Sequence, residues 1–202
     1  MEILVTFIIL IFSAIVHEVS HGVMAERLGD DTAREEGRIT LNPIPHIDPF
    51  GSILLPVLLL AAHSPIIFGA AKPVPVNFGN LRKPKSGMAL VSLAGPLSNF
   101  AMAALFAVVI KLGLANAVAY PILLQAILIN LVLGTFNLVP IPPLDGSKIL
   151  AALGSDRFMA QILSMERYGF ILVLVFLYLG WLNYLLVPVI AWFGQIFGLR
   201  FF

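Results

Sequence analysis

The chain has 202 residues, of which 59% are hydrophobic and 11% are charged, and its net charge is +1. Soluble domains carry about 25% charged residues, so this composition predicts a membrane protein. Apolar segments fill most of the length, and we therefore expect one domain over residues 1–202. The small net charge argues against nucleic acid as a partner. Because the chain has no cysteine, a transition metal would have to be bound by His, Asp or Glu.

The first apolar segment, residues 3–25, is long enough to cross a bilayer, whose core of about 30 Å needs about 20 mostly apolar helical residues. It starts after an acidic residue, Glu2, and is longer than the apolar region of a signal peptide. We therefore do not expect it to be a cleavable signal peptide. The segment nevertheless contains the motif HEVSH at 17–21. Ionisable side chains at membrane depth are costly and usually mark function.

The spacing of this motif suits a metal ion. His17 and His21 are four residues apart, so both imidazoles lie on the same face of a helix and can bind one ion. Glu18 can then reach a water molecule at that ion. The alternative is a buried polar cluster that bridges two helices, which is disfavoured by the cost of placing such residues in lipid.

Four further apolar stretches, two of them interrupted, predict an all-α polytopic membrane protein with about four to six transmembrane segments. These stretches are 51–69, 88–113, 117–139 and 168–199. The stretch 51–69 is barely long enough to cross and is interrupted at 63–65 by His-Ser-Pro. The stretch 168–199 is too long for one straight crossing, and it has breaks at 180–183 and at Pro188, which leaves one or two crossings open.

Asp145 is the acidic residue that stands out beyond the first segment. It follows the apolar stretch 117–139 and a run with three prolines at 140–143, and it precedes Gly146. Proline ends regular helix, and irregular backbone at membrane depth is tolerated only where it faces protein or a wet cavity. The alternative interpretation of Asp145 is an ordinary turn or helix cap at the membrane interface.

The pattern as a whole resembles the site-2 protease family of intramembrane zinc metalloproteases, in a minimal form without PDZ-like or CBS-like regions. The resemblance depends on three motifs in family order: HEVSH at 17–21, GPLSN at 95–99 and NLVPIPPLDG at 137–146. It implies that one zinc ion per chain is bound by His17, His21 and Asp145. It also implies that Glu18 activates water, and that Asn99 and Asn137 support the substrate backbone or the oxyanion.

The function implied by this resemblance is hydrolysis of peptide bonds in transmembrane protein substrates, within or near the lipid bilayer, and we expect a single-span substrate. Two alternatives remain open. An intramembrane metal-ion transporter also needs charged residues at depth, but it does not need Glu18 next to a ligand. A catalytically inactive scaffold does not need the motif to be intact.

The positions of the three expected ligands constrain the topology. His17 and His21 lie about two-thirds of the way along their segment, and Asp145 lies beyond the C-terminal end of its own. They can meet only if both segments run in the same direction, which requires an odd number of crossings between them. Because 88–113 is one clear crossing, we expect 51–69 to be a re-entrant segment that does not span.

The basic residues fit this topology. If the C-terminal end of the first segment is cytosolic, ten of the twelve basic residues are cytosolic, as the positive-inside rule requires. They are Arg27, Arg34, Arg38, Lys72, Arg82, Lys83, Lys85, Lys148, Arg157 and Arg167. We therefore expect a multi-pass protein of a prokaryotic cell membrane with its active site nearer the cytosolic face.

Overall fold

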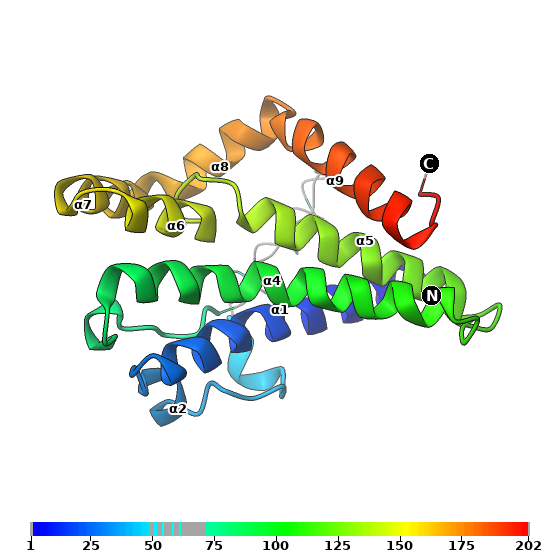
Figure 1. Ribbon diagram of the computed structural model, residues 1–202, viewed down its shortest axis with the longest axis horizontal. Coiled ribbons are helices and arrows are strands. Elements are labelled where there is room, and N and C mark those ends of the chain that lie inside the picture. The colour runs from blue at the N-terminus through cyan, green and yellow to red at the C-terminus, as the bar shows by residue number, and fades with distance from the viewer. Residues whose placement is uncertain are drawn as a thin grey trace.

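The computed structural model describes residues 2–48 and 72–201, together with positions 51, 54, 58 and 61. Within these residues every regular element is helical (Figure 1). The α-helices are α1 (Glu2–Arg27), α2 (Thr32–Glu35), α4 (Pro84–Lys111), α5 (Ala119–Asn137), α6 (Asp145–Leu153), α7 (Asp156–Ser164), α8 (Gly169–Tyr178) and α9 (Trp181–Phe197). The short 3₁₀ helices are η1 (Ile44–His46), η3 (Phe78–Asn80) and η4 (Met165–Tyr168).

In the part of the chain that the structure describes, four helical segments are long and apolar enough to cross a membrane, which confirms the predicted polytopic all-α bundle. They are Ile3–Arg27, Pro84–Lys111, Ala119–Asn137 and Asp156–Tyr178. The break expected at 180–183 lies at Gly180, whose φ of +69° separates α8 from α9. The second expected break, at Pro188, is absent because α9 continues through this proline. Membrane helices tolerate proline when neighbouring groups satisfy the freed carbonyl.

Helix α4 lies at the centre of the bundle and packs against α1, α5 and α6. Following the chain in Figure 1, α1 and α5 run in the same direction and α4 runs in the opposite direction. Among the described residues, α4 is the crossing that joins these two parallel helices, as the sequence predicts. The C-terminal part of α1, which carries His17 and His21, and the C-terminal end of α5, which Asp145 follows, therefore lie toward the same end of the bundle.

The predicted re-entrant segment at 51–69 lies outside the described residues, apart from a few isolated positions. The residues on either side of it are described, and they meet. The Lys72 amide donates to the His46 carbonyl at 2.8 Å, and the Arg82 amide donates to the Leu28 carbonyl at 3.0 Å. The chain that follows this segment thus returns to the same end of α1 that the preceding chain leaves.

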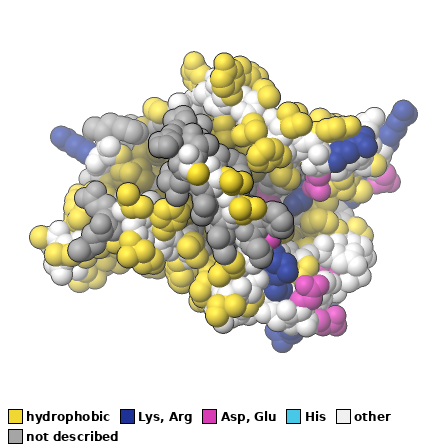
Figure 2. All heavy atoms as spheres, turned by 180° about the vertical axis from the view of Figure 1, so that it is seen from behind, with side chains coloured by type: hydrophobic (Ala, Val, Ile, Leu, Met, Phe, Trp, Pro, Cys, Tyr) yellow, Lys and Arg dark blue, Asp and Glu magenta, His cyan; other side chains and the backbone are white. Residues whose placement is uncertain are grey.

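Small residues bring the central helices close together. Ala103 and Ala107 of α4 are fully buried against Ile127 and Leu131 of α5. A Cβ atom on Gly134 would lie 3.2 Å from the Pro96 carbonyl oxygen, so α4 and α5 approach closely here. Small residues promote such packing in membranes, where apolar side chains gain little by leaving lipid. Hydrophobic side chains cover much of the face shown in Figure 2, as contact with lipid requires.

Candidate metal centre

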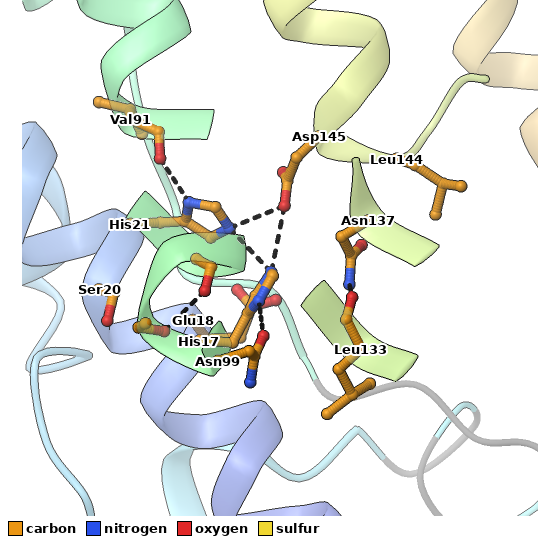
Figure 3. A network of polar contacts seen from close by, with 12 residues as sticks. His17, Glu18, Ser20, His21, Val91, Asn99, Leu133, Asn137, Leu144 and Asp145 are labelled. Carbon is orange, nitrogen blue, oxygen red and sulfur yellow. Dashed lines mark hydrogen bonds and ion pairs between the residues drawn. The ribbon is translucent and has the colours of Figure 1, made fainter. Parts of the chain in front are cut away.

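Three side chains from α1 and α6 converge inside the bundle. His17 Nε2 lies 3.1 Å from Asp145 Oδ2, and His21 Nε2 lies 3.2 Å from the same oxygen. The two Nε2 atoms lie 3.1 Å apart. All three residues are buried, each with 8% or less of its surface exposed. The structure therefore brings together the three ligands that the motifs predict (Figure 3).

The outer nitrogen of each imidazole is bound by the protein. His21 Nδ1 lies 2.7 Å from the Val91 carbonyl oxygen of α4. A carbonyl only accepts hydrogen bonds, so this nitrogen donates, and in the neutral imidazole the Nε2 atom then carries a lone pair. His17 Nδ1 lies 2.7 Å from Asn99 Oδ1, also on α4, and donates in the same way. Such outer contacts commonly orient histidine ligands of metals.

When both imidazoles are neutral and both Nδ1 atoms donate outward, two Nε2 lone pairs and one carboxylate oxygen point at one another. Three acceptors in a buried place repel each other unless a cation lies among them, either a metal ion or a proton on an imidazole. Tetrahedral zinc with ligand distances of about 2.0–2.1 Å has ligand–ligand separations of about 3.3 Å, close to those found here. The donor set and its spacing therefore fit a zinc ion.

Gly95 of α4 forms the wall behind this centre. A Cβ atom at this position would lie 2.5 Å from His21 Nε2 and 2.6 Å from His17 Nε2. Real Cβ atoms essentially never approach a side chain so closely. A side chain at position 95 would thus occupy space that the ligand atoms and their ion need, which explains why the GPLSN motif begins with glycine.

Asp145 is presented by a break between two helices. Helix α5 ends at Asn137, and α6 begins with Asp145 itself. Gly146 is packed so tightly against the Leu138 carbonyl that a Cβ atom would collide with it. The Ser147 hydroxyl donates to the Leu144 carbonyl at 2.7 Å and fixes the first turn of α6. The expected ligand is thus also the first residue of a helix, where a carboxylate is favoured by the helix dipole.

Glu18 lies beside the centre and is only half-buried. Its Oε2 atom accepts a hydrogen bond of 2.8 Å from the Val74 amide. Val74 belongs to a segment without regular structure, and the Arg38 guanidinium holds this segment by donating to the Lys72 and Pro73 carbonyls at 2.9 and 3.2 Å. The carboxylate next to the ligands therefore faces non-helical chain, whereas the ligands face the interior of the bundle.

The two asparagines of the motifs differ in their surroundings. Asn99 is fully buried, and its Nδ2 atom donates to Asn130 Oδ1 at 2.9 Å and to the Ser13 carbonyl at 3.3 Å. Asn137 is half-buried and donates to the Leu133 carbonyl, one turn back, at 3.0 Å. The contacts of Asn99 are therefore made with the protein, and they include a ligand histidine.

Asn130 and Ser13 are two polar side chains near the site that the motifs do not predict. Both are buried and hydrogen-bonded to each other, with Asn130 Nδ2 lying 2.9 Å from Ser13 Oγ. The available signal was an amide side chain in the middle of an apolar stretch. This signal marks a polar contact between helices but does not identify the partner.

Comparison with known proteins gives the family. The model of peptidase family M50 matches residues 113–180. The Bacillus subtilis protein named "Putative zinc metalloprotease YwhC" is 41% identical over 192 residues, which cover 91% of this chain and 84% of that protein. The chain belongs to peptidase family M50. The site-2 protease resemblance is thereby confirmed.

More distant relatives have the same kind of name. "Putative zinc metalloprotease Rip2" of Mycolicibacterium smegmatis is 29% identical and is matched over 72% of its length by 93% of this chain. "Zinc metalloprotease MJ0392" of Methanocaldococcus jannaschii is 28% identical, and 94% of this chain covers 48% of that protein. No solved structure matches the chain significantly.

Proposed function

We propose that this member of family M50 is a zinc metalloendopeptidase of the site-2 protease type, with the motif HEVSH as its centre. In this proposal it hydrolyses peptide bonds of transmembrane proteins within or near the bilayer. The observation that carries the proposal is the convergence of three buried side chains of metal-ligating type, those of His17, His21 and Asp145. Glu18 is the residue that follows His17 on the same helix.

In the proposed mechanism, His17, His21 and Asp145 hold one zinc ion per chain. When bound, zinc lowers the pKa of water to about 7 and polarises a carbonyl group. Glu18 accepts the proton of the attacking water and later delivers it to the leaving amine. Because Glu18 is half-buried and bound to a backbone amide at 2.8 Å, it can exchange this partner for water without leaving a buried charge.

The substrate must present an accessible peptide bond to this site. The carbonyl groups of a transmembrane helix are occupied by hydrogen bonds, so a substrate helix has to unwind locally before attack. The segment from Lys72 to Asn77 has no regular structure and lies beside Glu18. Its position favours cleavage of an unwound part of the substrate rather than of an intact helix.

Replacing Glu18 by Gln tests the proposed role directly. We expect Glu18→Gln to keep about one zinc per chain and to lose about 10²- to 10⁴-fold in cleavage, as the loss of an acid/base group does. Comparison of membrane proteomes from cells with the wild-type and the mutant enzyme should reveal a single-span protein that accumulates with the mutant. Glu35→Gln, at an exposed position on α2, is the matched control. Identical proteomes with zinc retained would favour a metal transporter or an inactive scaffold.

We further propose that the site lies nearer the cytosolic face of a prokaryotic cell membrane, as the distribution of basic residues supports. The wild type has no cysteine, so single cysteines can be labelled without background. Introduced at the exposed positions Glu36 and Lys83, they should react with an impermeant thiol reagent from the cytosolic side. A cysteine at Asn116, beyond α4, should react from the opposite side only. Labelling of Glu36 and Lys83 from different sides would contradict this topology.

A further inference from the structure

We propose that Asn130 and Ser13 are positioning residues that fix the amide of Asn99 and, through it, the tautomer of His17. The inference builds on the proposed zinc site and adds the residues that prepare one ligand for it. The three residues belong to α5, α1 and α4, so the network joins the three central helices. All are buried, with exposed fractions of 0% for Asn130, 1% for Ser13 and 0% for Asn99.

The orientation of the Asn130 amide is determined by a backbone carbonyl. Its Nδ2 atom lies 2.9 Å from the Ala126 carbonyl oxygen, one turn back on α5. Since this oxygen can only accept, the NH₂ group must face it, whichever way the amide is drawn. The other Nδ2 hydrogen is directed to Ser13 Oγ at 2.9 Å. Asn130 therefore presents its Oδ1 atom to Asn99.

The same reasoning fixes the next amide. Asn130 Oδ1 lies 2.9 Å from Asn99 Nδ2, which also donates to the Ser13 carbonyl at 3.3 Å. Both of these partners are acceptors, so the NH₂ group of Asn99 is held toward them. Its Oδ1 atom is left to face His17 Nδ1 at 2.7 Å. Flipping Asn99 would place an NH₂ group against His17 and an oxygen against two acceptors.

The consequence for His17 is a single useful tautomer. A neutral imidazole has one proton, and the Asn99 oxygen requires this proton on Nδ1. The Nε2 lone pair then points at Asp145 and His21, where the ion is proposed to bind. Without the network the proton could lie on Nε2, and the lone pair would point away from the centre. Because all three residues of the network are buried, water does not replace a lost hydrogen-bond partner there as it does at an exposed surface.

Nitrogen NMR of the metal-free wild-type protein tests the tautomer directly. The protein is labelled with ¹⁵N-histidine and measured at about pH 9, more than two units above the usual histidine pKa of about 6.5. The His17 signals are assigned by their loss in His17→Gln. We expect the proton on Nδ1. A proton on Nε2 in the wild type would overturn the inference, whatever any variant does.

The variant Asn130→Leu removes the network and keeps the volume of the side chain. We expect mixed His17 tautomers in the metal-free chain and a zinc affinity lowered by about 10- to 100-fold, as measured by competition with a chelator. Gln125→Leu is the matched control, because Gln125 also lies on α5 and donates to α1, at Thr6 Oγ1, but has no link to His17. This control should keep the wild-type tautomer and affinity.

A double mutant separates positioning from general packing. If Asn130 acts through Asn99, then Asn99→Leu and the double variant with Asn130→Leu should lose similar amounts of zinc affinity. Additive losses, an equal loss in Gln125→Leu, or wild-type affinity in Asn130→Leu would overturn the inference. If Asn130→Leu does not fold, Ser13→Ala serves instead, because it removes one hydrogen bond of the network and should lower zinc affinity about 2- to 10-fold. An unchanged zinc affinity in Ser13→Ala would then overturn the inference. A wild type that binds no zinc would contradict the proposed function, whereas the tautomer measurement would still test the network.

Discussion

Two buried acidic centres among the described residues differ in how their oxygens are satisfied. The Asp30 carboxylate, just beyond the C-terminal end of α1, has no exposed surface and receives hydrogen bonds from four donors. The Asp145 carboxylate, at the start of α6, faces the Nε2 atoms of two imidazoles, which carry lone pairs when the imidazoles are neutral. The first centre is complete within the protein, whereas the second is completed by a metal ion or by a proton on an imidazole.

The donors to Asp30 come from two stretches of the chain. The hydroxyl and amide of Thr32 approach one carboxylate oxygen, together with Asn80 Nδ2 at 2.9 Å. The Asn77 amide donates to the other oxygen at 2.7 Å. Burial by itself raises the pKa of Asp30, but these hydrogen bonds favour the ionised form and lower the pKa below its usual value. The cluster ties the chain that follows α1 to the chain that precedes α4.

The contrast between the Asp30 and Asp145 centres separates structural from functional polar groups in this protein. A buried group whose partners are all present stabilises the fold and requires nothing further. A buried group that meets only groups of its own kind is unfavourable by itself, and such an arrangement persists where a ligand completes it. Changes at the two centres should therefore have different consequences, for stability in one case and for metal binding in the other.

The largest expected effect is the complete loss of zinc from the double variant His17→Ala, His21→Ala. One carboxylate oxygen alone cannot hold the ion, since catalytic zinc sites use three protein ligands. Elemental analysis of purified protein should give about one zinc per chain for the wild type and none for the variant. His46→Ala, which removes a buried histidine bound to the Thr40 carbonyl, should keep the zinc. Full occupancy in the double variant would refute the assigned ligands.

The next largest expected effect is a loss of zinc affinity when Gly95, which forms the wall of the site, is replaced. Gly95→Ala should lower zinc affinity by about 100-fold or more, because the added methyl group would lie within 2.6 Å of both Nε2 atoms. Changes to residues that hydrogen-bond a ligand already cost about 10- to 100-fold in metal affinity, and this change touches the ligand atoms themselves. Gly134→Ala adds the same group to a buried glycine of α5, 3.1 Å from the Phe100 ring. It should leave zinc affinity unchanged in the same chelator competition, and a similar loss in both variants would point to packing instead.

The smallest expected effect is a loss of stability when Asp30, whose carboxylate is fully hydrogen-bonded, is replaced. Asp30→Asn should lower the free energy of unfolding by about 2 kcal/mol, since an NH₂ group would replace an oxygen that receives a charge-assisted hydrogen bond. Zinc content should not change. Asp31→Asn is the control, because its exposed side chain makes no capping hydrogen bond to α2. Thermal unfolding in detergent measures both variants, and loss of zinc from Asp30→Asn would show that the two centres are coupled.

Asp30 should also make the stability of the fold depend on pH. The pKa of Asp30 is lower in the folded than in the unfolded chain, so the folded state holds its proton less tightly. Its contribution to stability is fully present above the unfolded pKa of about 4, and it is lost as the pH falls through the lower folded value. Below about pH 4, the difference in unfolding temperature between the wild type and Asp30→Asn should therefore shrink. A constant difference down to about pH 2 would contradict this role.

Much of this molecule follows from local patterns in the sequence. Apolar stretches of sufficient length predict the spans, because only helices satisfy their own backbone in lipid. The i, i+4 spacing of His17 and His21 predicts a shared helical face, which the structure confirms. The run of prolines before Asp145 predicts the end of α5. The expected break at Pro188 was wrong because a single proline is compatible with a packed membrane helix.

The sequence by itself thus determined the helices, the candidate ligands and the parallel direction of α1 and α5, since each depends on composition, spacing or parity. Only the tertiary structure decided which nitrogen of each imidazole faces the centre. It depends on partners far away in the chain: Asn99 lies 82 residues from His17, and Val91 lies 70 residues from His21. Tertiary packing also decided that Asn130 belongs to the site and Asp30 does not. The physical reason is that a hydrogen bond depends on the position and orientation of both partners, and those of distant residues are set only when the helices pack.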